Sequence, residues 1–114
     1  NSAELAASIR AGKMVKVDHQ ETLADGCAGG VDNDTITLGL GTQVIDDLID
    51  CSENQIVSGL QQIAWSEKML VEGSAGLAYA AWQEDARNNK NKISAVVLCG
   101  ANFDKETLSP IVNL

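Results

Sequence analysis

Three residues stand where a side chain or bare backbone could contact a small ligand: Cys99, Glu72 and Gly26. Cys99 follows the apolar run Val-Val-Leu at 96–98, and in open α/β sheets ligands bind outside the carboxyl ends of strands. Glu72 stands at the predicted start of a helix, where the helix dipole stabilises a carboxylate by about 0.3–1 kcal/mol. Gly26 ends a polar turn and leaves backbone open to close approach. Residue type alone equally allows a small core thiol, a first-turn helix acid and a turn glycine.

These residues belong to three longer motifs. The motifs are Thr-Leu-Ala-Asp-Gly at 22–26, Val-Glu-Gly-Ser-Ala-Gly at 71–76 and Leu-Cys-Gly-Ala-Asn at 98–102. Together they resemble the carboxy-terminal part of threonine/serine dehydratases, which are pyridoxal-phosphate (PLP) enzymes of the tryptophan-synthase-β fold type, a group that includes serine racemase. The resemblance covers nearly all of the chain but only part of such an enzyme.

The resemblance implies that Cys99 and Gly100 line a PLP pocket, with the thiol hydrogen-bonded to the pyridine nitrogen. A neutral partner holds that nitrogen protonated less firmly than a carboxylate would, which suits β-elimination of a hydroxyl better than transamination. A thiol is a weaker donor than the hydroxyl that is commoner at this position in the family. Glu72 is implied to lie beside the cofactor ring and Gly26 against its face, where any Cβ would collide.

Two further titratable residues, Glu4 and His19, are interpreted as structural. Glu4 resembles the second carboxylate of the family's divalent-cation site, beside the Ser2 carbonyl, but the first carboxylate would lie before Asn1. Because two of three ligands rarely hold a cation, a solvated helix acid is favoured and no metal site is predicted. His19 has no serine, cysteine or acid at a diagnostic spacing, so it is predicted to be a loop histidine outside any triad.

The chain lacks other parts that the resemblance calls for. No segment resembles the lysine motif that would form a Schiff base with PLP, the loop for the substrate carboxylate, or the glycine-rich phosphate loop. A nucleophilic lysine needs an apolar pocket to lower its pKa. All the lysines stand instead in polar or helix-end contexts: Lys13, Lys16, Lys68, Lys90, Lys92 and Lys105. The chain alone is therefore predicted to form one wall of a cofactor pocket, to bind no PLP and to have no catalytic residue.

Composition narrows the class of protein. The 114 residues predict one domain over 1–114, resembling the carboxy-terminal part of the threonine dehydratase large domain. A net charge of −8 without a basic cluster disfavours nucleic acid and anionic membranes as partners. Three cysteines without a Cys-x-x-Cys pair favour reduced thiols in the cytoplasm over disulfides or zinc. No apolar run reaches the ~18 residues of a membrane helix, and no signal peptide is visible.

The pattern of elements predicts an α/β fold, a small and mainly parallel sheet flanked by helices. Helices are predicted from caps and periodicity at 2–12, 52–68, 73–87 and 104–108. The nearly continuous apolar run at 93–98 predicts a strand covered on both faces. Residues 31–41 are ambiguous, because Thr-Ile-Thr-Leu at 35–38 favours a strand whereas the family resemblance implies a short helix.

Three hypotheses follow. The first is a carboxy-terminal fragment of a PLP-dependent threonine/serine dehydratase-like enzyme, which when complete would convert a hydroxy-amino acid to an oxo-acid and ammonia. The second is a stand-alone, non-catalytic protein that self-associates and serves as a binding or scaffold module. The third is a regulatory partner of a whole dehydratase. An unpaired strand edge and bare apolar patches are expected, so the predicted partner is a second copy or a complementing chain.

Overall fold

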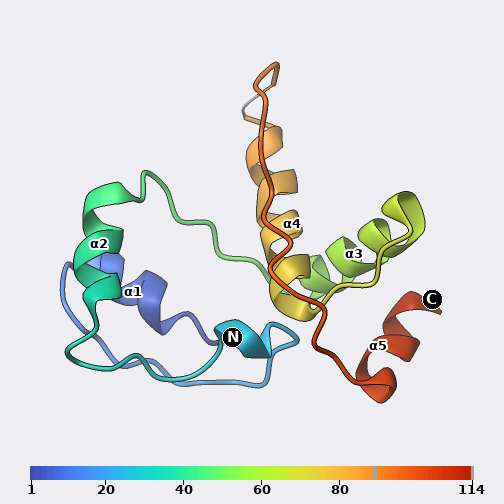
Figure 1. The fold of residues 1–114 in the computed structure, drawn as a ribbon. Coiled ribbons are helices and arrows are strands. Elements are labelled where there is room, and N and C mark those ends of the chain that lie inside the picture. The colour runs from blue at the N-terminus through green and yellow to red at the C-terminus, as the bar shows by residue number, and fades with distance from the viewer. Residues whose placement is uncertain (89, 114) are drawn as a thin grey trace.

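Two closely crossing helices hold the centre of the computed structural model, which describes residues 1–88 and 90–113 (Figure 1). Helix α3 (Glu53–Gln62) continues into a π-helical turn (Ile63–Glu67), and α4 (Gly73–Ala86) packs across it. A Cβ on Gly59 would lie 2.7 Å from the backbone oxygen of Gly76. The two axes can approach this closely only because both positions lack a side chain.

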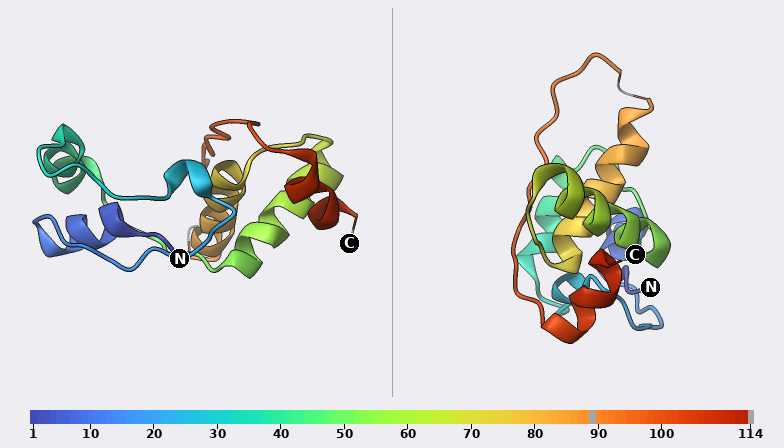
Figure 2. Two further views of the ribbon diagram at one scale, coloured as in Figure 1. Left: turned by 90° about the horizontal axis from the view of Figure 1, so that it is seen from below. Right: turned by 90° about the vertical axis from the view of Figure 1, so that its right-hand side faces the viewer.

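The other helices extend the molecule sideways from this crossing. They are α1 (Glu4–Ala11), a 3₁₀ turn (Asp25–Cys27), α2 (Ile36–Val44) and α5 (Lys105–Val112). Helices α1 and α2 pack together at one end and α5 lies at the other, so the molecule is a slab of 41 × 37 × 19 Å (Figure 2). Its radius of gyration is 14.8 Å, above the roughly 13 Å expected of a compact chain of this length.

The core follows the apolar stripe predicted for the helix after residue 52. Ile56, Leu60 and Ile63 are almost fully buried, and Ala64, the fourth member of the stripe, is buried as well. The remaining core residues come from the loops and helices around α3: Ala24, Val71, Ala75 and Ile111. The predicted stripe is therefore confirmed, and it faces three other parts of the chain.

Helix caps confirm most of the predicted boundaries. Ser52 and Gln55 form the predicted capping box, in which each side chain accepts a hydrogen bond from the other residue's backbone N–H. Asp104 accepts from the backbone N–H of Thr107 at 2.6 Å and starts α5, which continues past the predicted end to Val112. Gly12 ends α1 in the left-handed conformation at φ +65°. These local signals act within four residues, which is why the sequence reveals them.

Two local expectations are corrected. Ser2 does not cap α1, because the capping position falls on Ala3 and the Ser2 hydroxyl contacts His19. The ambiguous region 31–41 contains a helix, α2, whose first N–H groups are capped by the side chain of Thr35. The family resemblance was thus the better guide than the strand propensity of the β-branched residues, a propensity that depends on cross-strand neighbours.

The predicted α/β class with a parallel sheet is wrong, since no described residue lies in a β-strand. Residues 93–98 run as a single extended segment beside the helices (Figure 1). Ile93 and Val97, on one face of the segment, are 104% and 74% exposed, whereas Val96 and Leu98 on the other face are half-buried, so the segment is not covered on both faces as the apolar pattern required. A strand exists only when its N–H and C=O groups pair with a neighbouring strand. The apolar run at 93–98 indicates that the segment favours burial, but it does not provide a neighbouring strand for pairing.

The molecule exposes more surface than a compact protein of its mass. Its accessible surface is 7619 Å², whereas a folded monomer of 12.0 kDa is expected to expose about 6,000 Å². The excess is therefore about 1,600 Å², and exposed large apolar side chains contribute to it in three places. The first is along α2, at Ile36, Leu40 and Val44; the second follows Gln62, at Trp65, Met69 and Leu70; the third is the extended segment, at Ile93 and Val97. The three on α2 are spaced by four residues and form one uncovered helix face.

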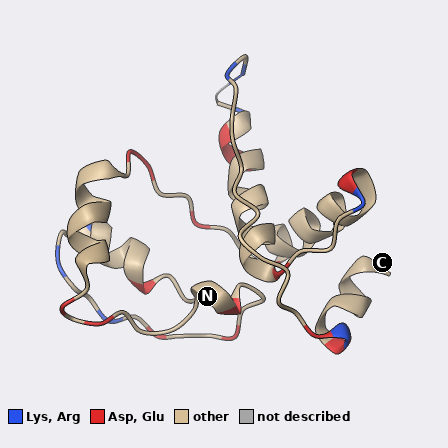
Figure 3. Ribbon diagram, viewed as in Figure 1, with Lys and Arg blue, Asp and Glu red and all other residues tan. Residues whose placement is uncertain are grey.

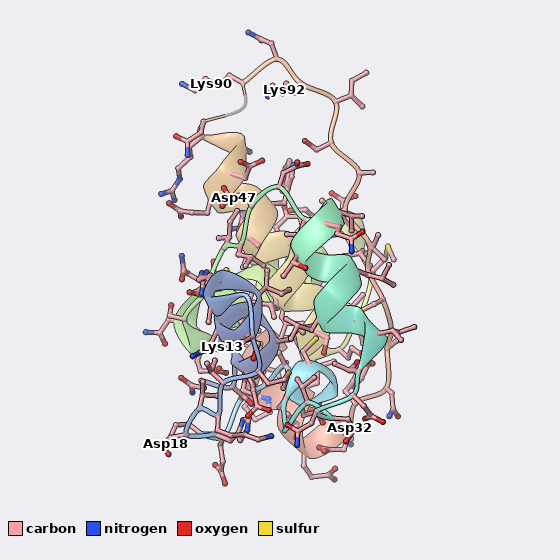
Figure 4. All side chains as sticks on the ribbon, turned by 90° about the vertical axis from the view of Figure 1, so that its left-hand side faces the viewer. Lys13, Asp18, Asp32, Asp47, Lys90 and Lys92 are labelled. Carbon is pink, nitrogen blue, oxygen red and sulfur yellow. The ribbon has the colours of Figure 1, made fainter. Side chains whose placement is uncertain are left out.

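Charged residues are spread over the helix ends and loops (Figure 3). Figure 4 shows Asp18 and Asp32 at one end of the molecule and Lys90 and Lys92 in the loop at the opposite end, and Lys13 and Asp47 are exposed as well. Within residues 1–88 and 90–113, no helix combines the length and apolarity needed to cross a bilayer.

Replacing Gly59 with alanine tests whether the close crossing of α3 and α4 holds the fold. The added methyl group would meet backbone that cannot move aside, so Gly59→Ala should lower the free energy of unfolding by about 1–3 kcal/mol. The control is Gly39→Ala on α2, where a Cβ meets no atom within 4 Å and should stabilise the helix by about 0.5–1 kcal/mol. Urea unfolding followed by circular dichroism measures both, and equal shifts in the two variants would contradict this account.

Candidate functional site

Glu72 connects α4 to the end of the extended segment through both its backbone and its side chain. Its backbone N–H donates to the carbonyl oxygen of Gly100 at 3.1 Å, and its Oε2 accepts from the backbone N–H of Asn102 at 2.9 Å. A Cβ on Gly100 would lie 2.6 Å from Oε2, so this carboxylate fills the space that a side chain would need. Residues 30 positions apart are thereby joined at the amino terminus of α4, where a negative charge is favoured.

Gly26 approaches the same carboxylate from the opposite side. A Cβ on Gly26 would lie 3.5 Å from Glu72 Oε1 and 2.9 Å from the hydroxyl oxygen of Ser74. Ser74 is 4% exposed, and its hydroxyl has no hydrogen-bond partner in the protein. Such an unpaired buried hydroxyl is uncommon, because burial without a hydrogen bond costs about 1–3 kcal/mol.

Two contacts fix the loop that carries Gly26. The backbone N–H of Leu23 donates to Glu53 Oε2 at 2.9 Å, which ties the loop to the first turn of α3. A Cβ on Gly73 would lie 1.7 Å from the backbone oxygen of Leu23, so the first residue of α4 touches the loop backbone directly. The two helices of the central crossing therefore position both sides of the site.

The structure brings together three of the four residues predicted to line a cofactor: Gly26, Glu72 and Gly100. The fourth, Cys99, precedes Gly100 in the extended segment, where it is exposed and makes no disulfide. The surface around the Glu72 carboxylate is formed by two glycines and a small hydroxyl. The arrangement places one carboxylate between two side-chain-free stretches of backbone, with the exposed Cys99 next to Gly100.

A second polar cluster surrounds Glu4, and it corrects the interpretation of that residue. Glu4 is 2% exposed rather than solvated. Its Oε1 accepts from the backbone N–H of Val31 at 2.7 Å and from Lys16 Nζ at 3.1 Å, and its Oε2 lies 3.1 Å from His19 Nε2. His19 is in a loop as predicted, but its Nδ1 lies 2.6 Å from the hydroxyl oxygen of Ser2. The sequence spacing gave no sign of these serine and acid contacts, which join residues 17 and 15 positions apart.

Hydrogen bonding lowers the pKa of Glu4 from 4.5 to about 2, chiefly through the Val31 N–H and secondarily through Lys16 and His19. Burial acts in the opposite direction but is outweighed. Glu4 is consequently a carboxylate at every pH at which the protein would function.

Sequence reasoning missed Ser74 and the cluster around Glu4 for different reasons. Ser74 lies inside the motif at 71–76, but only the tertiary structure shows that its hydroxyl is buried without a partner. His19 is 15 residues from Glu4 and 17 from Ser2, and no short-range spacing indicates such contacts. The concentration of glycines at 26–30 was the available signal, since the N–H of Gly29 also donates to Ser2 Oγ at 3.1 Å.

Comparison with known proteins identifies the family of this chain. Residues 1–100 match the pyridoxal-phosphate dependent enzyme family, and the chain therefore belongs to that family. The predicted resemblance to threonine dehydratases and serine racemases is confirmed by both sequence relatives and structural neighbours.

Among the relatives, L-threonine ammonia-lyase of Thermotoga maritima is 28% identical over 113 residues, covering 99% of this chain and 28% of that protein. Serine racemase of Schizosaccharomyces pombe is 29% identical over 99 residues, covering 87% of this chain and 30% of the relative. The structure of maize serine racemase superposes with a TM-score of 0.80 at 24% identity, over 96% of this chain and 34% of the maize chain. The chain thus spans about a third or less of the length of these proteins.

The Gly100→Ala variant tests the packing around Glu72. Because the new methyl group would meet the end of a flexible side chain, the carboxylate should move away from the Asn102 N–H while the fold persists. The free energy of unfolding should fall by about 1 kcal/mol, the net value of one hydrogen bond. Amide hydrogen exchange at Asn102 should become faster, and unchanged protection there would contradict the arrangement.

The depressed pKa of Glu4 makes stability depend on pH in a defined window. A carboxyl group whose pKa is lower in the folded state stabilises the protein above its ordinary value of 4.5, and this contribution disappears as the pH falls toward 2. Urea midpoints measured from pH 6 to pH 2 should therefore decline in the unmodified chain. The decline should be shallower in Glu4→Gln, and identical slopes would refute the assignment.

Proposed function

We propose that the chain forms one wall of a PLP pocket in a threonine/serine dehydratase-like enzyme, in which the Glu72 carboxylate, Cys99 and the glycines at 26 and 100 face the cofactor. The complete enzyme would convert a hydroxy-amino acid to an oxo-acid and ammonia, and this chain alone would not be catalytic. The observation that carries the proposal is the meeting of Gly26, Glu72 and Gly100 around one carboxylate, formed by the three motifs that resemble the family.

The residues present fit such a cofactor. The exposed Cys99 offers a thiol to the cofactor, and the side-chain-free backbone at Gly26 and Gly100 lets the Glu72 carboxylate stand between those two segments beside it. The hydroxyl of Ser74 lies 2.9 Å from where a Gly26 Cβ would stand and is buried beneath this surface without a protein partner.

Bound PLP would withdraw electrons from the amino acid and so permit loss of its β-hydroxyl. The role proposed for Cys99 is a hydrogen bond from its thiol to the pyridine nitrogen, which leaves that nitrogen less firmly protonated than a carboxylate partner would. Glu72 would remain beside the ring, held in place by the Asn102 N–H. Gly26 would bound the ring on one face.

We propose further that a complementing polypeptide covers the exposed apolar surface. The excess accessible surface of about 1,600 Å² per chain corresponds to an interface of the size found in permanent complexes. The chain spans 28% to 34% of the relatives named above, whose remaining parts would supply such a cover. The open apolar segment at 93–98 would then gain strand partners, and the lysine and phosphate loop would come from the same polypeptide.

A chimera tests the proposal directly. The matching segment of the T. maritima ammonia-lyase would be replaced by this chain, and PLP binding and deamination of threonine would be measured. We expect both to be retained, because the transplanted wall would meet the lysine and phosphate loop of the host. A folded chimera that does not bind PLP would refute the assignment of this wall.

Cysteine variants of that chimera test the role of Cys99. Cys99→Ala should weaken PLP binding about 2- to 10-fold, the effect of losing one hydrogen bond of about 0.5–1.5 kcal/mol. Cys99→Ser should bind at least as tightly as the parent, because a hydroxyl is the better donor. The matched control is Cys51→Ala, which removes a thiol before α3 and should leave affinity unchanged. Equal affinity for PLP in all variants would show that Cys99 does not contact the cofactor.

A second candidate is a stand-alone protein that self-associates through its apolar surface, without catalysis. The uncovered stripe of Ile36, Leu40 and Val44 favours it, because such helix faces pair readily with one another. Sedimentation equilibrium distinguishes the two functions. A dimer that Leu40→Glu dissociates would support self-association, whereas a monomer that binds the amino-terminal part of a relative would support the complementing chain.

A further inference from the structure

We propose that Ser2, His19 and Glu4 form a nucleophilic site that cleaves esters of apolar carboxylic acids, at a place separate from the PLP wall and independent of that function. The Ser2 hydroxyl oxygen lies 2.6 Å from His19 Nδ1, and His19 Nε2 lies 3.1 Å from Glu4 Oε2. Nucleophile, base and orienting acid thus follow one another at hydrogen-bond distances in the order of a serine triad, with the roles of the two ring nitrogens exchanged.

The hydrogen-bond partners determine the direction of proton transfer. Glu4 is a carboxylate and can only accept, so a neutral His19 must donate its proton from Nε2 to Glu4 Oε2. Nδ1 then carries the lone pair and accepts the Ser2 hydroxyl proton. The backbone N–H of Gly29 donates to Ser2 Oγ at 3.1 Å, which fixes the hydroxyl oxygen and leaves one lone pair for attack.

Glu4 is anchored so that only one of its oxygens serves His19. Its Oε1 is occupied by the Val31 N–H at 2.7 Å and by Lys16 Nζ at 3.1 Å. With the carboxylate buried and held by two donors, Oε2 stays directed at the imidazole. Glu4 is accordingly a positioning residue, whereas Ser2 and His19 would be catalytic.

The serine borders a suitable acyl site. A cavity of about 300 Å³ is lined by Ser2 and otherwise mainly by apolar side chains, among them Leu5, Ile9, Ile45 and Ile56. This volume is at the lower end of the range for small-molecule pockets. A short aliphatic acyl chain fits it better than a charged or sugar group.

The reaction balances without a cofactor. Ser2 Oγ attacks the ester carbonyl carbon while its proton passes to His19 Nδ1, and the carbonyl π electrons move onto oxygen. The C–O bond to the alcohol then breaks, and the alcohol leaves with the proton from His19. Water repeats the sequence on the acylated serine, giving the carboxylic acid and free Ser2.

Covalent labelling of the unmodified 114-residue chain is the primary test. A fluorophosphonate probe should add once per chain, on Ser2 as located by peptide mass spectrometry, and faster in the folded chain than in urea. The chain should also hydrolyse p-nitrophenyl butyrate, with a rate about 10²- to 10⁴-fold above that of His19→Gln, the range for general base catalysis. No adduct on Ser2 of the folded chain, or labelling no faster than in urea, would overturn the proposal.

Variants separate catalysis from structure. Ser2→Ala should abolish both labelling and hydrolysis, whereas Ser66→Ala, at an exposed serine outside the cluster, should change neither. Glu4→Gln can turn its amide N–H to His19 and impose the wrong tautomer, so kcat should fall by as much as in His19→Gln, about 10²- to 10⁴-fold, while KM for the ester stays the same. Hydrolysis that survives in Ser2→Ala, or a Glu4→Gln effect confined to KM, would overturn the assignment.

Discussion

The arrangement of this molecule depends on a backbone-to-backbone contact at Gly73. A Cβ there would stand 1.7 Å from the Leu23 oxygen, so no other residue could bring the start of α4 against the loop that holds Gly26. The close crossing of Gly59 and Gly76 sets the direction of α4 relative to α3 in the same way. Two glycine contacts therefore decide where the Glu72 carboxylate lies and which segments reach it.

Glu72 has a structural role where α4 begins. Its carboxylate fills the space left by Gly100 and accepts the Asn102 N–H, so it replaces a side chain that the extended segment lacks. The cost is a polar group that must stay paired in a partly buried place. A flat ligand resting on this surface would meet a charge that the protein already holds in position.

The missing sheet accounts for one of the exposed apolar regions. The apolar segment at 93–98 is built for burial on both faces, and the described residues provide no strand to pair with it. The chain nevertheless superposes on a third of serine racemase with a TM-score of 0.80. The fold of this part of the family is thus kept by helices and loops in the absence of a sheet.

Local interactions were predictable from the sequence. The capping box at Ser52, the stop at Gly12, the Asp104 cap and the apolar stripe of α3 each depend on residues within a few positions, and each prediction is confirmed. The motifs at 22–26, 71–76 and 98–102 also indicated the PLP enzyme family.

Tertiary structure alone decided three other matters. The apolar segment at 93–98 has no strand partner among the described residues, Glu4 is buried, and Ser2, His19 and Glu4 meet. Each depends on groups brought together across the chain by backbone packing. No local spacing encodes such contacts, because the distance between two residues in space is set by every turn and close approach that lies between them.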